Sequence, residues 1–377
     1  MTLKTTLREY QAEALRRWHM RLAQGFGLFM EQRTGKTLVA LAVIDAEKPA
    51  RILIVTPLKG IDVWQAQLQQ HLFIDWACEV RVMNFEQVVK ARSKLRRWAT
   101  GGMVIVDESH RIKRRGSTFS RALRSIGKKA LYRLALTGTP IAQGIHDAWA
   151  QLDFLDPTIL GPWTSFQDRY CVMGGYRGKK VVGFQNVEEF QRILHEHSYR
   201  LTLKEAQQGR ATLVRYVRCP VTLGSERCHY HELEDALITY VNEEEIQAPI
   251  VITQAMKLQQ LTGGWIVGPS GTPHQVGTAK EAALLRLLET FDSGPHVICV
   301  RFIHELEHLG HLGESQGKRV QTISGAGNFY TPEDPPDWIL IQIQAGVAID
   351  LSQASRIIFY SWDYSYINYE QLRFRIL

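Results

Sequence analysis

Short apolar runs alternate with helix-like stretches along the first part of the chain. Short runs rich in branched aliphatic residues indicate buried strands, and longer stretches with a helical period indicate helices. The predicted strands are 27–31, 51–56, 80–84, 103–107 and 132–136, and the predicted helices are 37–47, 64–72, 86–98, 117–126 and 147–155. This alternation predicts a parallel β-sheet with helices on both faces, because parallel strands need long crossover connections.

A second alternating series begins near residue 212. Its predicted strands are 214–222, 296–301, 319–323, 338–342 and 356–360, and its predicted helices are 225–242, 250–262, 278–291 and 303–312. A chain of 377 residues is too long for one hydrophobic core. We therefore expect an α/β protein with two tandem domains, 1–205 and 206–377, each a mostly parallel sheet flanked by helices. The glycine- and aromatic-rich region 157–200 is expected to be irregular, with a short hairpin and a helix.

The composition is that of a soluble globular protein, with 45% hydrophobic and 22% charged residues. No apolar run reaches the length of a membrane-spanning helix, and no signal peptide opens the chain. The five cysteines are scattered, which is typical of a reduced compartment and predicts a cytoplasmic protein. Cys228, His229 and His231 lie close together, but no second pair at metal-ligand spacing accompanies them. A helix is therefore favoured over a metal site there.

Positive charge is concentrated in one part of the chain, although the net charge is only +7. The stretch from Ser109 to His146 contains no acidic residue. Its basic residues are Arg111, Lys113, Arg114, Arg115, Arg121, Arg124, Lys128, Lys129 and Arg133. A block of one sign on a folded segment favours a surface that contacts phosphates, and a solvated face is the alternative.

Residues 27–38, GLFMEQRTGKTL, combine a predicted strand, a loop and the start of a predicted helix. The Gly35-Lys36-Thr37 tripeptide at the helix start is typical of a Walker A phosphate-binding loop. Backbone N–H groups at a helix N-terminus attract anions, Lys36 would reach the β- and γ-phosphates, and the Thr37 hydroxyl would bind Mg²⁺. Met30 stands where the motif has its first glycine, so an ordinary strand-to-helix turn is the alternative.

Residues 102–115, GMVIVDESHRIKRR, place two acids directly after a predicted buried strand. A buried carboxylate is unfavourable unless it is paired or bound to a metal. A nucleoside triphosphatase needs an acid at such a strand end to hold the Mg²⁺ shell, and Asp107 fits that role. Glu108 beside it would act as the general base that polarises the attacking water. Together with the loop at Lys36, these acids predict a Mg²⁺-dependent nucleoside triphosphatase.

Asp107-Glu108-Ser109-His110 resembles the DExH box of superfamily-two helicases. Further stretches resemble that family's motifs in the expected order: residues 7–11 (LREYQ) the upstream glutamine motif, residues 55–57 (VTP) with Trp64 motif Ia, and residues 136–140 (LTGTP) motif III. The following residues, IAQGIHDAWAQLDFLDP, are similar to the Swi/Snf-type branch, with Gln143 in place of its usual Asn. The likeness covers nearly the whole chain.

The second predicted domain carries the later motifs of the same family. VICVRF at 297–302 resembles motif IV, residues 344–351 resemble motif V one residue short, and residues 369–375 resemble the start of motif VI. The family's motif VI has two arginines three residues apart; Arg375 matches the first, and the second would fall beyond Leu377. We therefore expect either a chain truncated within motif VI or impaired hydrolysis. The small size resembles members encoded by phages and bacteria, so the expected location is a bacterial or phage-infected cytoplasm.

The resemblance implies two RecA-like domains with ATP·Mg²⁺ between them. It assigns ATP binding to Arg8, Gln11, Thr34, Gly35, Lys36 and Thr37, the metal to Thr37 and Asp107, catalysis to Lys36, Glu108 and Arg375, and coupling to His110, Thr137, Gly346 and Asp350. Thr137 capping the turn before Pro140 is the alternative for that residue. Candidate contacts to nucleic-acid phosphates are Thr56, Lys59, Lys113, Arg114 and Arg301. Trp163, Tyr170 and Tyr176 are candidates for base stacking, with core packing the favoured alternative, and 243–245 is expected to be a solvated helix end.

The predicted function is an ATP-dependent DNA translocase or helicase that moves along or remodels duplex or branched DNA, mainly through phosphate contacts. An RNA helicase is one alternative, since DExH motors act on both nucleic acids. A nucleotide-responsive DNA clamp with weak ATPase activity is another, favoured by the missing second arginine. The protein is expected to be monomeric.

Overall fold

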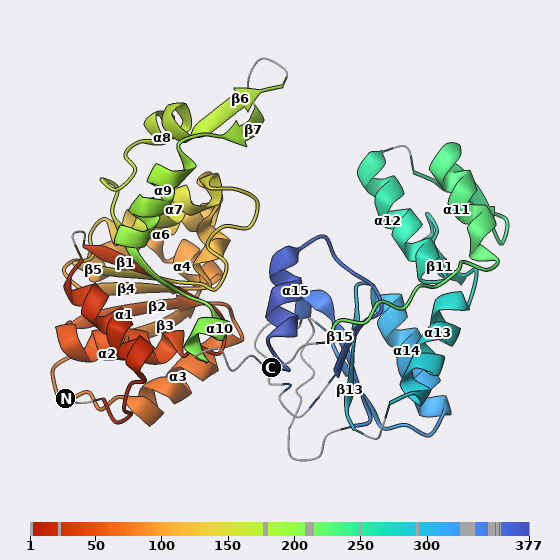
Figure 1. Ribbon diagram of the computed structural model, residues 1–377, viewed down its shortest axis with the longest axis horizontal. Helices are drawn as coiled ribbons and strands as arrows, with labels where there is room; N and C mark the ends of the chain where they lie inside the picture. Colours follow the sequence, from red (N-terminus) through yellow and green to blue (C-terminus); the bar gives the residue numbers. More distant parts are fainter. Residues whose placement is uncertain are drawn as a thin grey trace. The chain divides into compact units, whose positions relative to one another are not determined.

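The structure is a computed structural model that describes residues 3–21, 24–175, 180–207, 215–248, 250–291, 294–324, 336–345 and 356–376, with Leu351 and Ala354. The chain divides into two compact units, Met1–Ala211 and Thr212–Leu377 (Figure 1). Each unit contains its own sheet and its own hydrophobic cores. The sequence had placed the division six residues earlier, at 205/206.

The first unit is built on a six-stranded sheet with the order β3-β2-β4-β5-β1-β8. Every neighbouring pair of strands is parallel. The strands are β1 (Gly25–Met30), β2 (Arg51–Thr56), β3 (Glu79–Asn84), β4 (Met103–Asp107), β5 (Tyr132–Leu136) and β8 (Ser198–Leu201). The first five match the predicted strands closely. Strand β8 was not predicted, because its four residues follow a region without a clear period.

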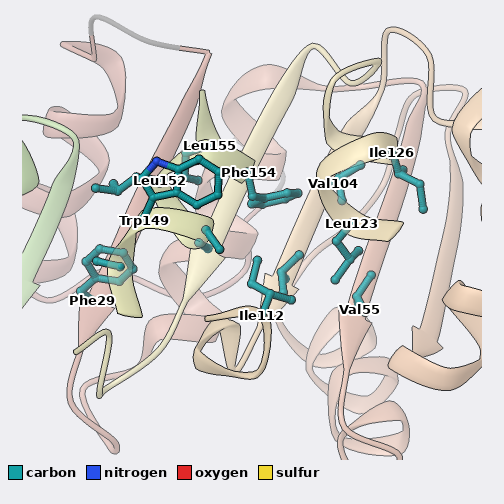
Figure 2. Close-up of a cluster of buried hydrophobic side chains, with 14 of the residues drawn as sticks. Phe29, Val55, Val104, Ile112, Leu123, Ile126, Trp149, Leu152, Phe154 and Leu155 are labelled. Carbon is teal, nitrogen blue, oxygen red and sulfur yellow. The ribbon is translucent and has the colours of Figure 1, made fainter. Parts of the chain in front are cut away.

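Helices cover both faces of this sheet, as predicted. On one face lie α1 (Glu9–His19), α2 (Lys36–Glu47) and α3 (Gly60–His71); on the other lie α4 (Phe85–Lys90), α5 (Arg92–Trp98), α6 (Thr118–Gly127) and α7 (His146–Leu155). Alternate strand residues serve the two cores: Val104 and Val106 pack with α6 and α7, and Met103 and Ile105 pack with α1 and α2. Figure 2 shows the core on the α6–α7 face. Burial on both faces explains the uninterrupted apolar strands.

The region expected to be irregular contains two helices and a hairpin. Helix α8 (Trp163–Tyr170) leads into the antiparallel pair β6 (Cys171–Gly174) and β7 (Lys180–Phe184), and α9 (Val187–Glu196) follows. Trp163 makes an edge-to-face contact with Trp149 at 5.4 Å, and the hydroxyl of Tyr170 donates to Glu189 at 2.7 Å. Core packing therefore accounts for both aromatic residues, and Tyr176 lies outside the described residues.

The second unit is built on a four-stranded parallel sheet with the order β14-β15-β13-β16. The strands are β13 (His296–Val300), β14 (Val320–Ile323), β15 (Trp338–Gln342) and β16 (Arg356–Phe359). Its flanking helices include α13 (Ala279–Glu289), α14 (Ile303–Ser315) and α15 (Tyr366–Arg373). Two apolar clusters lie on the two faces of this sheet. The predicted α/β class, with a helix-flanked parallel sheet in each unit, is confirmed.

Two predictions in the second unit are wrong. The described part of the predicted strand at 214–222 is irregular, and the predicted helix at 225–242 ends early. Helix α11 (Glu226–Asp235) is followed by the hairpin β9 (Ile238–Val241) and β10 (Glu244–Gln247). Asn242 and Glu243 have φ values of 49° and 66°, the two-residue hairpin turn that such positive angles favour. Residues 243–245 thus form a turn and a strand instead of a helix end.

Helix α12 (Val251–Thr262) and the short pair β11 (Trp265–Val267) and β12 (Pro273–Gln275) complete this part of the second unit. The cysteine and histidines of α11 are used in local hydrogen bonds: Cys228 with Glu232 at 3.3 Å, and His229 with Thr239 at 2.9 Å. Among the described residues, no group of three or more His, Cys, Asp or Glu side chains is arranged to hold a metal ion. Within the same residues, no helix is long and apolar enough to span a bilayer.

Candidate nucleotide-binding site

The loop after β1 turns directly into the first residue of α2. Gly35 has φ 78° and ψ 36°, a left-handed conformation, and Lys36 is the first helical residue. A Cβ atom on residue 35 would lie 2.3 Å from Nε2 of Gln11. Both the backbone conformation and this close approach require glycine. The turn places the first backbone N–H groups of α2 directly after the loop, and their contact with an anion stays a prediction.

Gln11 connects this loop to α1. Its Oε1 accepts a hydrogen bond from the backbone N–H of Arg8 at 2.9 Å, and its Nε2 donates to the carbonyl oxygen of Thr34 at 3.1 Å. Gln11 and Thr34 are both buried, and the hydroxyl of Thr34 donates to the carbonyl oxygen of Glu31 at 2.6 Å. Arg8 is exposed. The side chain of Gln11 therefore holds the phosphate-binding loop against the first helix.

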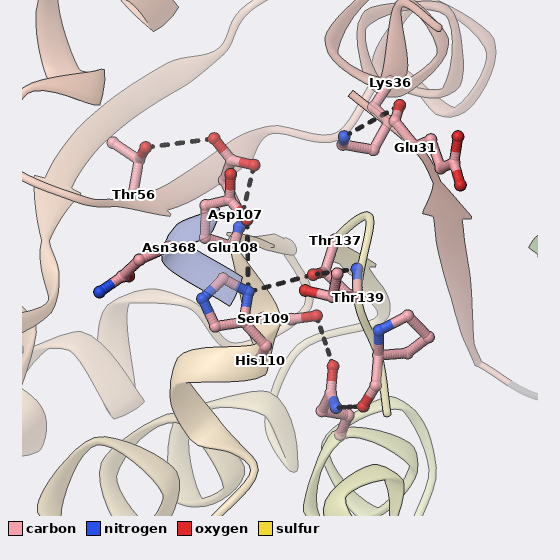
Figure 3. Close-up of polar contacts among 12 residues, drawn as sticks. Glu31, Lys36, Thr56, Asp107, Glu108, Ser109, His110, Thr137, Thr139 and Asn368 are labelled. Carbon is pink, nitrogen blue, oxygen red and sulfur yellow. Dashed lines mark hydrogen bonds and ion pairs between the residues drawn. The ribbon is translucent and has the colours of Figure 1, made fainter. Parts of the chain in front are cut away.

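Lys36 and Thr37 lie in the first turn of α2. The Nζ atom of Lys36 donates to the carbonyl oxygen of Glu31 at 3.3 Å. Its positive charge also acts to lower the pKa of Asp107, which shows that the two side chains are close. Figure 3 shows the amino group of Lys36 on the side of the loop that faces Asp107 and Glu108. The predicted meeting of the loop and the paired acids is therefore present.

Asp107 ends β4 and its carboxylate is enclosed by neighbouring groups. One oxygen accepts hydrogen bonds from the hydroxyl of Thr56 at 3.2 Å and the indole N–H of Trp64 at 2.9 Å, and the other accepts from the backbone N–H of Glu108 at 2.9 Å. Although the residue keeps some accessible surface, desolvation of the carboxylate raises its pKa, and the negative charge of Glu108 raises that pKa further. A bound cation would favour the charged form of both acids.

Glu108 adopts a left-handed backbone conformation, with φ 49° and ψ 50°. This conformation is uncommon for a residue with a side chain, and such strain concentrates at functional sites. It turns the chain from β4 into the 3-10 turn η1 (Ser109–Ile112). The Oε2 atom of Glu108 then lies 3.3 Å from Nδ1 of His110.

Hydrogen bonds connect the ends of β4 and β5. Nδ1 of His110 lies 3.1 Å from the hydroxyl oxygen of Thr137, and that oxygen accepts from the backbone N–H of Thr139 at 3.1 Å. Thr137 is fully buried. Thr137 therefore both caps the turn before Pro140 and contacts His110, so the two alternatives for this residue are compatible. Figure 3 shows this chain of contacts running from Glu108 to Thr139.

A second set of hydrogen bonds also connects the turn after β4 to the loop after β5. The hydroxyl of Ser109 donates to Oε1 of Gln151 at 2.7 Å, and Nε2 of Gln151 donates to the carbonyl oxygen of Pro140 at 2.7 Å. Ser109 and Gln151 are fully buried. The loop after β5 is thus attached to the acid-bearing turn at two points, one at Thr137 and one at Pro140.

The strand order explains why these groups meet. Asp107 is in register with Leu136 of β5, and Leu136 is in register with Leu28 of β1. Neighbouring strands lie about 4.8 Å apart, so β1 and β4 are about 10 Å apart across β5. Because all three strands are parallel, the loops that follow them emerge at the same edge of the sheet.

The predicted nucleic-acid contacts of the first unit differ in their accessibility. Thr56 is fully buried and its hydroxyl donates to Asp107, so its side chain is not accessible to a phosphate in this structure. Lys59 and Arg114 are exposed. Lys113 is half-buried, with Nζ 3.6 Å from the carboxylate of Asp147.

The basic block between Ser109 and His146 does not form one continuous surface. Arg114 and Arg115 follow the carboxyl end of β4, whereas Lys128 and Lys129 precede the amino end of β5, at the opposite edge of the sheet. Arg133 is buried at only 3% exposure. The basic block is therefore divided between two edges of the sheet, because α6 crosses the sheet between the two groups, and its contact with phosphates stays a prediction.

In the second unit, Arg301 is half-buried, and its guanidinium donates to Oε1 of Gln259 and lies 5.1 Å from the centre of the Tyr364 ring. Arg375 follows the end of α15 and is half-buried. Gly346 and Asp350 lie outside the described residues. The predicted roles of these four residues remain predictions.

Three polar residues that support the acids were not assigned a role from the sequence. Trp64 donates to Asp107, Gln151 connects Ser109 to Pro140, and Asp147 accepts hydrogen bonds from the backbone N–H groups of residues 142 and 143 at 3.1 and 2.8 Å. Asp147 and Gln151 occupy positions four residues apart on α7 and are both buried. In the sequence, polar residues on a largely apolar helix could have indicated a buried hydrogen-bond network.

The sequence matches the family model described as an SNF2-related domain over residues 73–208. Among curated proteins, the chain is 28% identical over 142 residues to the ISWI chromatin-remodeling complex ATPase CHR11 of Arabidopsis thaliana, covering 38% of this chain and 13% of that protein. It is 33% identical over 113 residues to the ISWI chromatin-remodeling complex ATPase ISW1 of Saccharomyces cerevisiae, covering 29% and 10%. The chain therefore spans only a small part of the length of these relatives.

Among solved structures, the Sulfolobus solfataricus SWI2/SNF2 ATPase core in complex with dsDNA matches with a TM-score of 0.48 and 18% sequence identity. The match covers 95% of this chain and 82% of that chain.

Replacing Asp107 with Asn removes an enclosed charge beside Glu108, but it also removes one of the two oxygens that accept hydrogen bonds, so the informative quantity is how the stability difference from the wild type changes with pH. The pKa of Asp107 is raised in the folded state, so the wild type loses stability as the pH rises through that pKa. The stability of Asp107→Asn relative to the wild type should therefore increase as the pH rises above the ordinary carboxyl pKa, measured by urea unfolding at a series of pH values. Asp168→Asn, at an exposed position of α8, is the control. A stability difference that stays constant or falls as the pH rises would contradict this prediction.

Proposed function

We propose that this chain, which matches the SNF2-related domain model over residues 73–208 and is similar to chromatin-remodelling ATPases, is a DNA-dependent ATPase that couples ATP hydrolysis to movement along duplex DNA. The observation that carries the proposal is the set of contacts from Glu108 through His110 to Thr137, beside the loop that bears Lys36. These contacts join a site suited to phosphate chemistry to a loop that can respond to it.

In this proposal the triphosphate lies at the start of α2, where backbone N–H groups and Lys36 contact its β- and γ-phosphates. Gln11, with Arg8 beside it, contacts the adenine. The carboxylate of Asp107 and the hydroxyl of Thr37 are oxygen ligands of the kind that Mg²⁺ prefers, and the close acid pair Asp107–Glu108 favours a cation. The bound Mg²⁺ would neutralise charge on the phosphates.

Glu108 would act as the general base. A water oxygen attacks the γ-phosphorus, the bond to the β–γ bridging oxygen breaks, and ADP and phosphate leave. The proton of the water passes to the Glu108 carboxylate. Arg375 is proposed to stabilise the negative charge that develops on the γ-phosphate, a role that arginine fingers perform in related enzymes.

Protonation of Glu108 would change its contact with His110, which is 3.3 Å away. His110 in turn contacts Thr137, whose oxygen also holds the backbone of Thr139. We propose that this chain of contacts transmits the state of the nucleotide to the loop at residues 137–140. Gly346 and Asp350 of the second unit are proposed to take part in the same coupling.

The DNA would be contacted mainly through its phosphates, because a motor that moves along DNA cannot depend on base sequence. Lys59, Lys113, Arg114 and Arg301 are the proposed contacts. The relationship to chromatin-remodelling ATPases favours duplex DNA, with branched DNA as a further substrate. Comparing duplex DNA, single strands and RNA as stimulators of phosphate release tests this choice, and RNA as the best stimulator would favour the RNA-helicase alternative.

Lys36→Ala is expected to lower the ATP hydrolysis rate by at least about a hundredfold, because one positive charge on the transferred phosphate is lost. Salt-sensitive DNA binding should remain largely intact, since Lys36 is not among the proposed phosphate contacts. Phosphate release and fluorescence anisotropy with a labelled duplex measure the two effects. Lys48→Ala, at the exposed end of α2, is the matched control. Normal hydrolysis by Lys36→Ala would show that the loop does not hold ATP.

Thr137→Val is expected to retain basal hydrolysis within about threefold while losing most of its stimulation by DNA. Valine has the same shape as threonine but lacks the hydroxyl, so the contact with His110 and the turn cap are both lost. Thr139→Val keeps the backbone N–H that makes the turn contact and serves as the control. Hydrolysis is measured with and without duplex DNA. Unchanged stimulation in Thr137→Val would contradict the coupling role, and very weak stimulation in the wild type would instead favour the clamp alternative.

A further inference from the structure

A cavity of about 840 Å³ lies at the amino edge of the first sheet. It is lined by Arg21, Gln24, Lys128, Leu131, Tyr132, Arg133, Asp156 and Pro157. Some of these residues lie just after the ends of α1, α6 and α7. The others lie at or just before the starts of β1 and β5. The loop at Lys36 and the acid pair lie at the carboxyl edge of the same strands, about one strand length or 17 Å away. The cavity is therefore separate from the nucleotide-binding site.

The side chains around the cavity are mainly cationic. Three of the eight lining residues carry a positive charge and one, Asp156, carries a negative charge. The carboxylate of Asp156 is already engaged, because it accepts from the backbone N–H and hydroxyl of Thr158 at 2.9 and 2.7 Å. Arg21 has one acidic neighbour, with Nη1 3.4 Å from Oε1 of Glu47. The charged lining residues therefore sum to +2, and the carboxylates of Glu47 and Asp153 beside the two arginines offset part of this charge.

Both arginines keep hydrogen-bonding capacity that the protein does not use. Arg133 is only 3% exposed; its Nη2 donates to Oε1 of Gln24 at 2.5 Å, but its Nε has no hydrogen-bond partner. Nη1 of Arg21 donates to the carbonyl oxygen of Trp18 at 2.8 Å, and its Nε also has no partner. Both Nε atoms are enclosed by the protein, so an anion in the cavity would be contacted by the Nη groups of the two arginines.

Burial makes these guanidinium groups better anion ligands. Desolvation lowers the pKa of Arg133 and of Arg21, which shows that water does not fully solvate their charges. A charge that is poorly solvated binds an opposite charge more strongly than one in open water. Guanidinium groups also match the geometry of phosphate oxygens, which they contact with two parallel hydrogen bonds.

We propose that this cavity binds a phosphate-bearing anion, held by Arg21, Lys128 and Arg133. The volume lies in the range of small-molecule sites and exceeds what one phosphate group occupies. Leu131, Tyr132 and Pro157 supply an apolar wall for the rest of the ligand. The phosphate is either part of a free small molecule, such as a nucleotide, or part of a nucleic-acid backbone. The inference does not depend on the proposed ATPase activity.

The alternative is that these positively charged side chains only offset the partial negative charge at the C-terminal ends of the helices. The last carbonyl groups of α1 and α6 point toward this edge, and Arg21 already donates to one of them. In that case Lys128 would contribute to stability but not to binding. Lys128 is exposed, so its replacement leaves the core intact, whereas Arg133 is buried and its replacement endangers folding.

The test is isothermal titration of pyrophosphate into the full chain carrying Lys36→Ala, which removes the main cation of the nucleotide loop. We expect pyrophosphate to bind. Adding Lys128→Glu should weaken this binding by about tenfold, because a positive side chain that contacts the anion becomes negative. Lys129→Glu is the matched control: it makes the same change at the next residue, which is exposed and does not line the cavity. Circular dichroism confirms folding of each variant.

Loss of affinity in Lys128→Glu alone supports the site. Absence of pyrophosphate binding in the Lys36→Ala protein, or equal loss in the Lys128→Glu and Lys129→Glu variants, overturns it. A short DNA duplex added as competitor separates the two sources of phosphate. Displacement of pyrophosphate supports a site for the nucleic-acid backbone, and binding that persists beside the duplex supports a site for a small phosphorylated molecule.

Discussion

The carboxylate of Asp107 is the group on which the arrangement of the first unit depends. Enclosing a charge at the end of a central strand is unfavourable, and the protein compensates with three hydrogen-bond donors from β2, α3 and its own backbone. Lys36 adds a positive charge from the loop after β1. Two of the donors, Thr56 and Trp64, are distant from Asp107 in sequence, so these hydrogen bonds require β2 and α3 to pack beside β4. The fold and the site are therefore linked through one side chain.

The left-handed backbone conformation of Glu108 sets the path of the chain after β4. Because Glu108 is left-handed, the chain leaves β4 sharply and brings Ser109 and His110 toward β5 and α7. Two contacts then tie the turn to the loop at 137–140. A site that only bound phosphate would not need this connection. Both the acid-bearing turn and the loop at 137–140 lie within residues 73–208, which match the SNF2-related domain model.

Most strands of both sheets could be predicted from the sequence, because strands buried on both faces are continuous apolar runs. The loop at Gly35 and the acids at 107 and 108 could be found for a related reason: polar residues stand out at the ends of such runs. The hairpin at 238–247 was mistaken for helix because its residues are mainly polar and its turn depends on positive φ values at Asn242 and Glu243. The contacts of Trp64 and Gln151 depend on packing between distant elements, which residue patterns do not encode.

We propose that Glu108 removes a proton from the water that attacks a triphosphate held by Lys36 and Asp107. Glu108→Gln keeps the shape of the side chain and removes its basicity, so single-turnover hydrolysis of radiolabelled ATP by this variant tests the claim most directly. The account predicts that ATP still binds, while the rate of the chemical step falls by about 10²–10⁴. Hydrolysis at the wild-type rate with ATP bound equally well would contradict it.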